Sequence, residues 1–266
     1  VDVLMTGDGS VSDVRIHPPQ DLCPNRPKAD EPCEPGSYEG APVVPSPEVV
    51  QVAEPFVREA AAKKNELVGI TVAEPFPQDG TRESALGNLL ADLILEARPG
   101  ADLAIMNGGG IRAPLPKGEL RYQGFFEVFP FDNRFARVRV SAGDLARVFE
   151  NNVSQDRSIL SVSGIRVRAR CEGEKVAVDL LDGRGRVISP SRKLTVITSD
   201  FIATGGDGGL GGEVTLEDGE PMREALLDRL RERAAPLRPD DPRLLDPKRP
   251  RFDVAQRPLP CSASHP

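Results

Sequence analysis

Apolar positions along the chain follow two periods, and these periods predict both strands and helices. Residues 67–75 (LVGITVAEP) and 101–106 (ADLAIM) are short apolar runs typical of strands, whereas residues 84–98 repeat apolar side chains on one helical face. The same reasoning predicts further strands at 135–140, 159–170, 176–181 and 194–199, and helices at 122–128, 141–153 and 221–235. Because the elements follow no strict β-α-β rhythm, we expect an α+β fold with a mixed β-sheet and helices packed on it.

The first 65 residues have a different pattern, which predicts separate pieces rather than a core. Residues 1–17 predict a hairpin around the turn GDGS, and residues 18–46 form a Pro-rich loop. An amphipathic helix is expected at 47–65, with Pro55 either kinking it or dividing it in two. Since the chain begins as a strand already under way, we expect a fragment that follows something folded, with the helix as a connector. Residues 236–266 are rich in Pro and Arg and are expected to wrap the surface or to be partly mobile.

Composition narrows the class of protein. The chain has 266 residues, a formal net charge of −7 and a pI of about 5.1, which argues against nucleic acid or an anionic membrane as a partner. No apolar run approaches the roughly 20 residues needed for a transmembrane helix.

Cysteine and histidine usage bears on location and chemistry. Cys23 and Cys33 lie in the Pro-rich loop and predict a local disulfide, while Cys171 and Cys261 could form a second bridge. Disulfides suggest an exported protein. The cysteine spacings do not favour zinc, and the two histidines of the chain lie near no glycine turn, which disfavours a Ser-His-Asp site.

Two glycine turns follow apolar strands and are candidate ligand sites. In the first, Asn107 precedes three glycines and Arg112, a set that lets a ligand approach the main chain beside a fixed cation. In the second, Phe201 and Asp207 flank a glycine cluster, and a carboxylate there suits the two hydroxyls of a ribose. The alternatives are a flexible turn for the first and a calcium-like loop or plain hairpin turn for the second.

Two further stretches hold candidate residues. Phe131 follows a proline and precedes Asp132-Asn133, so it could stack on a base from a loop or could be an ordinary core residue. Arg82 lies at a helix entrance, where backbone N–H groups favour anions, although a solvated arginine is the usual outcome there.

Taken together, the stretches RESALGNLLAD, IMNGGGIR, VFPFDN and SDFIATGGDG resemble, in order and spacing, the C-terminal domain of the 5′-nucleotidase family from about residue 66 to 210. The hairpin at 1–17 resembles the last strands of that family's N-terminal metallophosphoesterase domain, and residues 47–65 resemble its connector helix. The resemblance implies a remnant at 1–46, a connector at 47–65 and a substrate-binding domain at 66–266.

The resemblance also implies a role for each motif. Phe131 and Phe201 would sandwich the base, Asp207 would hold the ribose hydroxyls and Asn107 would reach the base. Arg82 and Arg112 would meet the ribose and phosphate. The full implied substrate site is Arg82, Asn107, Gly109, Gly110, Arg112, Phe131, Asn133, Phe201, Gly206 and Asp207.

The resemblance also implies which functional residues this chain does not contain. The family's two divalent metal ions and its catalytic residues belong to the N-terminal domain, and no matching Asp-x-His or Gly-Asn-His stretch occurs here. We therefore expect no catalytic or metal-binding residue in this chain, a nucleotide and the N-terminal domain as partners, and an exported hydrolase as the parent. The alternatives are a non-catalytic nucleotide-binding module, or a relative acting on cyclic nucleotides, sugar nucleotides or a sulfur ester.

Overall fold

The structure, a computed structural model, describes residues 1–19, 21, 36–38 and 40–261. These residues divide into two compact units, 1–60 and 61–266, and each is considered by itself. The predicted Cys23–Cys33 bridge lies outside the described residues.

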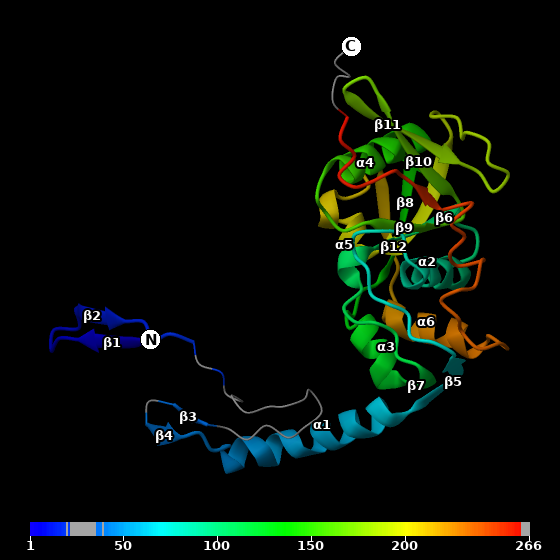
Figure 1. Ribbon diagram of the computed structural model, residues 1–266. Helices are drawn as coiled ribbons and strands as arrows, with labels where there is room; N and C mark the ends of the chain where they lie inside the picture. Colours follow the sequence, from blue (N-terminus) through cyan, green and yellow to red (C-terminus); the bar gives the residue numbers. More distant parts are fainter. Residues whose placement is uncertain (20, 22–35, 39, 262–266) are drawn as a thin grey trace. The chain divides into compact units, whose positions relative to one another are not determined.

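The first unit holds short strands and most of one helix (Figure 1). Strands β1 (Asp2–Met5) and β2 (Val11–Arg15) form the predicted antiparallel hairpin, and β3 (Ser37–Tyr38) pairs with β4 (Ala41–Pro42). Helix α1 (Pro47–Asn65) confirms the predicted helix and runs into the second unit. It is a single helix with Pro55 inside it, so division into two helices was wrong. None of its side chains is buried.

A five-stranded sheet organises the second unit. Its strands lie in the order β13 (Glu213–Leu216), β8 (Phe135–Ser141), β12 (Lys193–Ser199), β6 (Leu103–Asn107) and β9 (Leu160–Ser163). Strands β12 and β6 are parallel, and every other neighbouring pair is antiparallel. This is the mixed sheet expected from the sequence.

Both faces of this sheet are buried, which explains why β6 is apolar at successive positions. Ala104 and Met106 belong to a core formed with α2 (Ala85–Ala97), α3 (Tyr122–Val128) and α6 (Met222–Arg231). Leu103 and Ile105 point to a second core that includes α4 (Ala142–Ser154). The predicted α+β fold, with helices packed on a mixed sheet, is confirmed.

Two smaller sheets complete the unit. Strands β5 (Leu67–Val72) and β7 (Gly118–Arg121) pair with each other, and β10 (Arg166–Glu172) lies between β11 (Lys175–Leu181) and β14 (Phe252–Asp253). The predicted disulfide between Cys171 and Cys261 is present, with the Cα atoms 5.4 Å apart, and it fastens the end of the described chain to β10.

The prediction of one continuous strand at 159–170 is wrong. It is two strands, β9 in the central sheet and β10 in the smaller one. Gly164 separates them with φ +87°, and a Cβ atom there would lie 2.4 Å from the carbonyl oxygen of Asp102. The chain thus turns from one sheet to the other at a position that only glycine fits.

Helix α6 ends at Arg231, earlier than expected, and the chain beyond it packs on the domain. Leu237, Leu244 and Phe252 are buried, so this segment follows the surface but is fixed to it by apolar contacts. Among the described residues, no helix combines the length and hydropathy required to cross a bilayer.

Candidate functional site

Three loops meet at one edge of the central sheet because of the directions of its strands. Strands β6 and β12 are parallel, so the turns that follow them leave the sheet at the same edge. Strand β8 is antiparallel to β12, and therefore the loop that precedes it reaches this edge too. Residues from positions near 107, 131 and 207 are brought together in this way.

These loops enclose a cavity of about 310 Å³. Eight of the ten predicted substrate-site residues line it: Asn107, Gly109, Gly110, Arg112, Phe131, Asn133, Phe201 and Asp207. Phe131 is 39% exposed and Phe201 is 50% exposed, so neither ring is an ordinary core side chain. The cavity therefore joins two accessible aromatic faces to a carboxylate, an amide and a guanidinium.

Asn107 and Asp207 connect the two glycine turns. Asn107 is 6% exposed, and its Nδ2 donates a hydrogen bond of 2.7 Å to Oδ2 of Asp207. Asp207 has φ 52° and ψ 25° and is the one non-glycine residue with positive φ among those described. The hydrogen bond leaves the other carboxylate oxygen, Oδ1, with no protein donor among the described residues.

The glycines of both turns are required by close packing. A Cβ atom at Gly110 would lie 2.8 Å from Oδ1 of Asn107, and one at Gly108 would lie 2.8 Å from the carbonyl oxygen of Gly80. Gly206 lies beneath Phe201 rather than in the cavity wall, and a Cβ atom there would come within 2.5 Å of the ring. The glycines thus fix the positions of the side chains that line the cavity.

Arg82 lies apart from the other predicted residues. It precedes the N-cap of α2, as expected, but its side chain is 83% exposed and its Nε donates to Asp79 over 3.0 Å. It lines a different cavity, of about 450 Å³, together with residues of the C-terminal segment. Its contact with a ligand stays a prediction.

The position of Phe131 depends on a residue that sequence reasoning missed. Arg223 of α6 is 5% exposed, and it donates to the carbonyl oxygen of Phe131 over 3.3 Å and to Asp132 over 2.7 Å. Its guanidinium also lies 4.7 Å from the ring of Phe126. An arginine among the apolar positions of a helix was the only sequence signal for this role.

No metal site can be built from the described residues. They contain no group of three or more His, Cys, Asp or Glu side chains that could hold an ion. These residues therefore do not fit the two divalent metal ions that the resemblance assigns to the N-terminal domain, and we derive no chemical step through those ions.

The fold and the cavity together define a ligand-binding domain, and comparison with known proteins gives its family. The family model described as "5′-nucleotidase, C-terminal domain" matches residues 66–211. The chain belongs to this family.

Relatives and solved structures agree with this assignment. The chain is 30% identical to the endonuclease YhcR of Bacillus subtilis over 58% of its own length and 12% of that protein, and 29% identical to human 5′-nucleotidase over 48% and 26%. The crystal structure of a 5′-nucleotidase precursor from Thermus thermophilus is 25% identical, with a TM-score of 0.61 over 86% of this chain and 47% of that one. The chain thus spans less than half of each of these relatives.

Proposed function

We propose that this chain is the nucleotide-recognition domain of a metal-dependent nucleotide phosphohydrolase. The observation that supports this most directly is the cavity at the sheet edge, where Phe131 and Phe201 both present accessible rings. A purine or pyrimidine base held between two such rings would gain roughly 1–3 kcal/mol from each stack. Because every base has a planar face, such a site accepts several bases.

The polar residues of the cavity suit the remainder of a nucleotide. Asp207 offers a carboxylate oxygen to the ribose hydroxyls, and Asn107 holds that carboxylate in place through its 2.7 Å hydrogen bond. Arg112 lies in the same cavity and can receive the phosphate end; among the described residues, the carbonyl oxygen of Gly109, at 3.3 Å, is the one hydrogen-bond partner of its Nη1. The chemistry at the phosphate would belong to metal ions held by an N-terminal domain.

The parent protein is proposed to be exported. The disulfide between Cys171 and Cys261 is the observation that favours an oxidising compartment. Residues 1–46 are proposed as the remnant of the N-terminal domain and the helix at 47–65 as the connector; residues 1–60 form a compact unit of their own, and the helix crosses its boundary.

Calorimetric titration tests the recognition role. AMP, UMP, adenosine and UDP-glucose would be titrated into the wild-type chain and into Phe201→Ala, with Phe56→Ala as the control because Phe56 is exposed on α1 and lines no part of this cavity. Loss of one stack should weaken binding by about 5- to 150-fold. Equal affinity of the wild type and Phe201→Ala would contradict the stacking role.

A second experiment tests the division of labour. The purified chain, given AMP and a divalent metal, should release no phosphate, because it holds no cluster of metal ligands within the described residues. Metal-dependent phosphate release that a chelator abolishes would refute this part of the proposal while leaving the binding role intact.

A further inference from the structure

A second cavity, of about 360 Å³, lies at the opposite end of the central sheet. The cavity at the sheet edge lined by Asn107, Phe131, Phe201 and Asp207 is called the nucleoside cavity below. In the antiparallel pair formed by β6 and β9, Asn107 pairs with Leu160 near this cavity, whereas Ala104 pairs with Ser163 further along. Ser163 and Gly164 line the second cavity, so the length of β9 separates the two. No residue lines both cavities.

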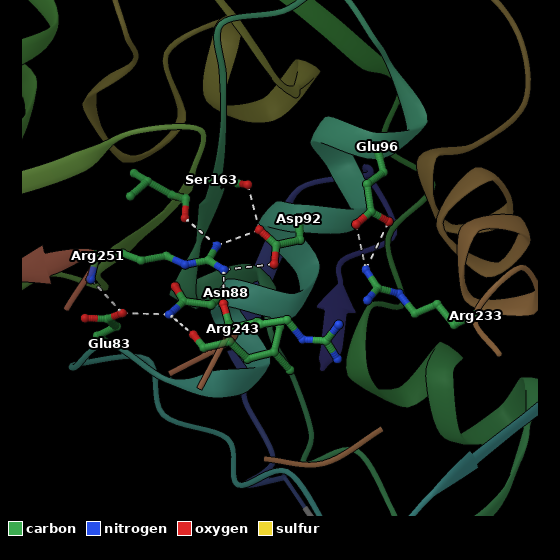
Figure 2. A network of polar contacts seen from close by, with 10 residues as sticks. Glu83, Asn88, Asp92, Glu96, Ser163, Arg233, Arg243 and Arg251 are labelled. Atoms are coloured by element: carbon green, nitrogen blue, oxygen red, sulfur yellow. Dashed lines mark hydrogen bonds and ion pairs between the residues drawn. The ribbon is translucent and has the colours of Figure 1, made fainter. Parts of the chain in front are cut away.

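Three arginines and two aspartates line this cavity, a surplus of one positive charge in a chain whose net charge is −7. One pair is already satisfied: Arg251 donates to both carboxylate oxygens of Asp92 at 2.5 and 2.9 Å, and Ser163 adds a hydrogen bond of 2.6 Å (Figure 2). The side chains of Arg251 and Asp92 are 18% and 19% exposed. This largely buried ion pair therefore adds no net charge to the wall of the cavity.

The other two arginines are Arg166 and Arg249. Within the part of the chain that the structure describes, neither guanidinium has a carboxylate within 4.0 Å or a hydrogen-bond partner. Arg166 is held close to the turn after β11, since a Cβ atom at Gly185 would lie 2.8 Å from its Nη2. Asp246 is the remaining acid, and its Oδ1 accepts the backbone N–H of Lys248 at 2.9 Å.

We propose that this cavity is a second ligand site, which binds a phosphate group through Arg166 and Arg249. A guanidinium presents a planar fork of donors that matches phosphate oxygens. Because Asp92 is already paired with Arg251, the guanidinium groups of Arg166 and Arg249 keep their donors for a ligand. The cavity volume of about 360 Å³ is large enough for inorganic phosphate or a small phosphate ester. The site does not depend on the nucleoside cavity or on its proposed function.

Amide NMR titration of the chain with inorganic phosphate, at constant ionic strength set with sodium chloride, tests the proposal. The amides of Ser163, Gly164 and Gly183 should shift together and saturate with one dissociation constant. The Arg166→Gln, Arg249→Gln double variant should bind phosphate about tenfold or more weakly, the factor expected for one charge-assisted hydrogen bond. Arg184→Gln is the control for each single replacement, because it also removes one positive charge but from an exposed turn residue that lines no part of the cavity.

Parallel titrations with ribose 5-phosphate and AMP identify the source of the phosphate group. Tighter binding of either ester than of inorganic phosphate at these amides would assign the site to an ester, and the reverse order to the free ion. If sodium chloride alone reproduces the shifts, or if the double variant keeps wild-type affinity with a dispersed spectrum, the proposal is overturned. If the double variant does not fold, the single variant of exposed Arg249 must show the loss.

Discussion

Glu83, which precedes the N-cap of α2, is one of the points at which the C-terminal segment is attached to the domain, and its replacement by glutamine probes that attachment (Figure 2). Its Oε1 accepts hydrogen bonds from Nδ2 of Asn88 at 2.7 Å and from the backbone N–H of Arg251 at 3.0 Å. Its Oε2 accepts the backbone N–H of Phe252 at 3.1 Å. A glutamine keeps one oxygen and turns an NH₂ group toward a donor. At least one N–H in a partly buried position is then left without an acceptor.

The magnitude follows from these contacts. Hydrogen bonds to a charged acceptor contribute about 1.5–3 kcal/mol, and an unsatisfied buried donor costs about 1–3 kcal/mol. We therefore expect Glu83→Gln to lower the free energy of unfolding by about 2–4 kcal/mol. With an m-value of about 2 kcal/mol/M in urea, the unfolding midpoint should fall by about 1–2 M.

Glu96→Gln provides the matched control; Glu96 lies within α2, whereas Glu83 precedes the N-cap of that helix. Glu96 accepts two hydrogen bonds from Nη2 of Arg233, at 2.8 and 3.0 Å, but its side chain is 48% exposed. Exposed ion pairs contribute about 0–1 kcal/mol, so this variant should shift the urea midpoint by less than about 0.5 M. Urea unfolding followed by circular dichroism measures both variants. Equal shifts for the two variants would refute the role assigned to Glu83.

Three further predictions address the site and the titrating groups. Gly206→Ala places a Cβ atom 2.5 Å from the ring of Phe201, so nucleotide affinity should fall about tenfold in calorimetry, whereas Gly7→Ala, with no atom within 4 Å and no part in either cavity, should leave it unchanged. Burial and a hydrogen bond to Glu224 of α6 raise the pKa of Tyr122 above 10.0. The contribution of the neutral phenol to the stability of the fold is therefore fully present below pH 10 and is lost as the pH rises through the raised pKa. In a Tyr38→Phe variant, where Tyr122 is the remaining tyrosine, the absorbance titration should have its midpoint above 10.0. Burial alone would raise the pKa of Asp79, but hydrogen bonds from the loop after it outweigh burial and lower that pKa below 3.8. Asp79→Asn should thus be less stable than the wild type near pH 6 and equally stable near pH 2, as thermal unfolding would show.

The sequence predicted the long elements well because their apolar periods matched their burial. Helix α3 begins and ends at the predicted residues, and β12 differs by one residue at its start. The strands β7 and β13 were missed because they are four residues long and mostly exposed, so they carry no apolar period. The division between β9 and β10 was missed because one glycine, Gly164, decides it through a contact with Asp102, which is distant in sequence.

The cavity at the sheet edge was predicted in large part because its residues stand beside glycine turns at strand ends. Strand direction then brings these turns together, and eight of the ten predicted residues line one cavity. Arg223 and Glu83 act on loops that are remote in sequence, and no local pattern reveals such contacts. The second cavity could not be predicted for the same reason: Arg166 and Arg249 lie 83 positions apart, and only the fold shows that neither has an acidic partner among the residues described.

The backbone of Asp207 gives an independent reason to treat the two glycine turns as one site. A left-handed conformation costs a non-glycine residue about 1–2 kcal/mol, and glycines were available on both sides of this position. That cost is offset here by the hydrogen bond from Asn107, a residue 100 positions earlier in the chain. Fixing a carboxylate at the wall of a cavity, in an unfavourable backbone conformation, gives no evident benefit to the fold. It is what a site needs when the carboxylate must be in place before the ligand arrives.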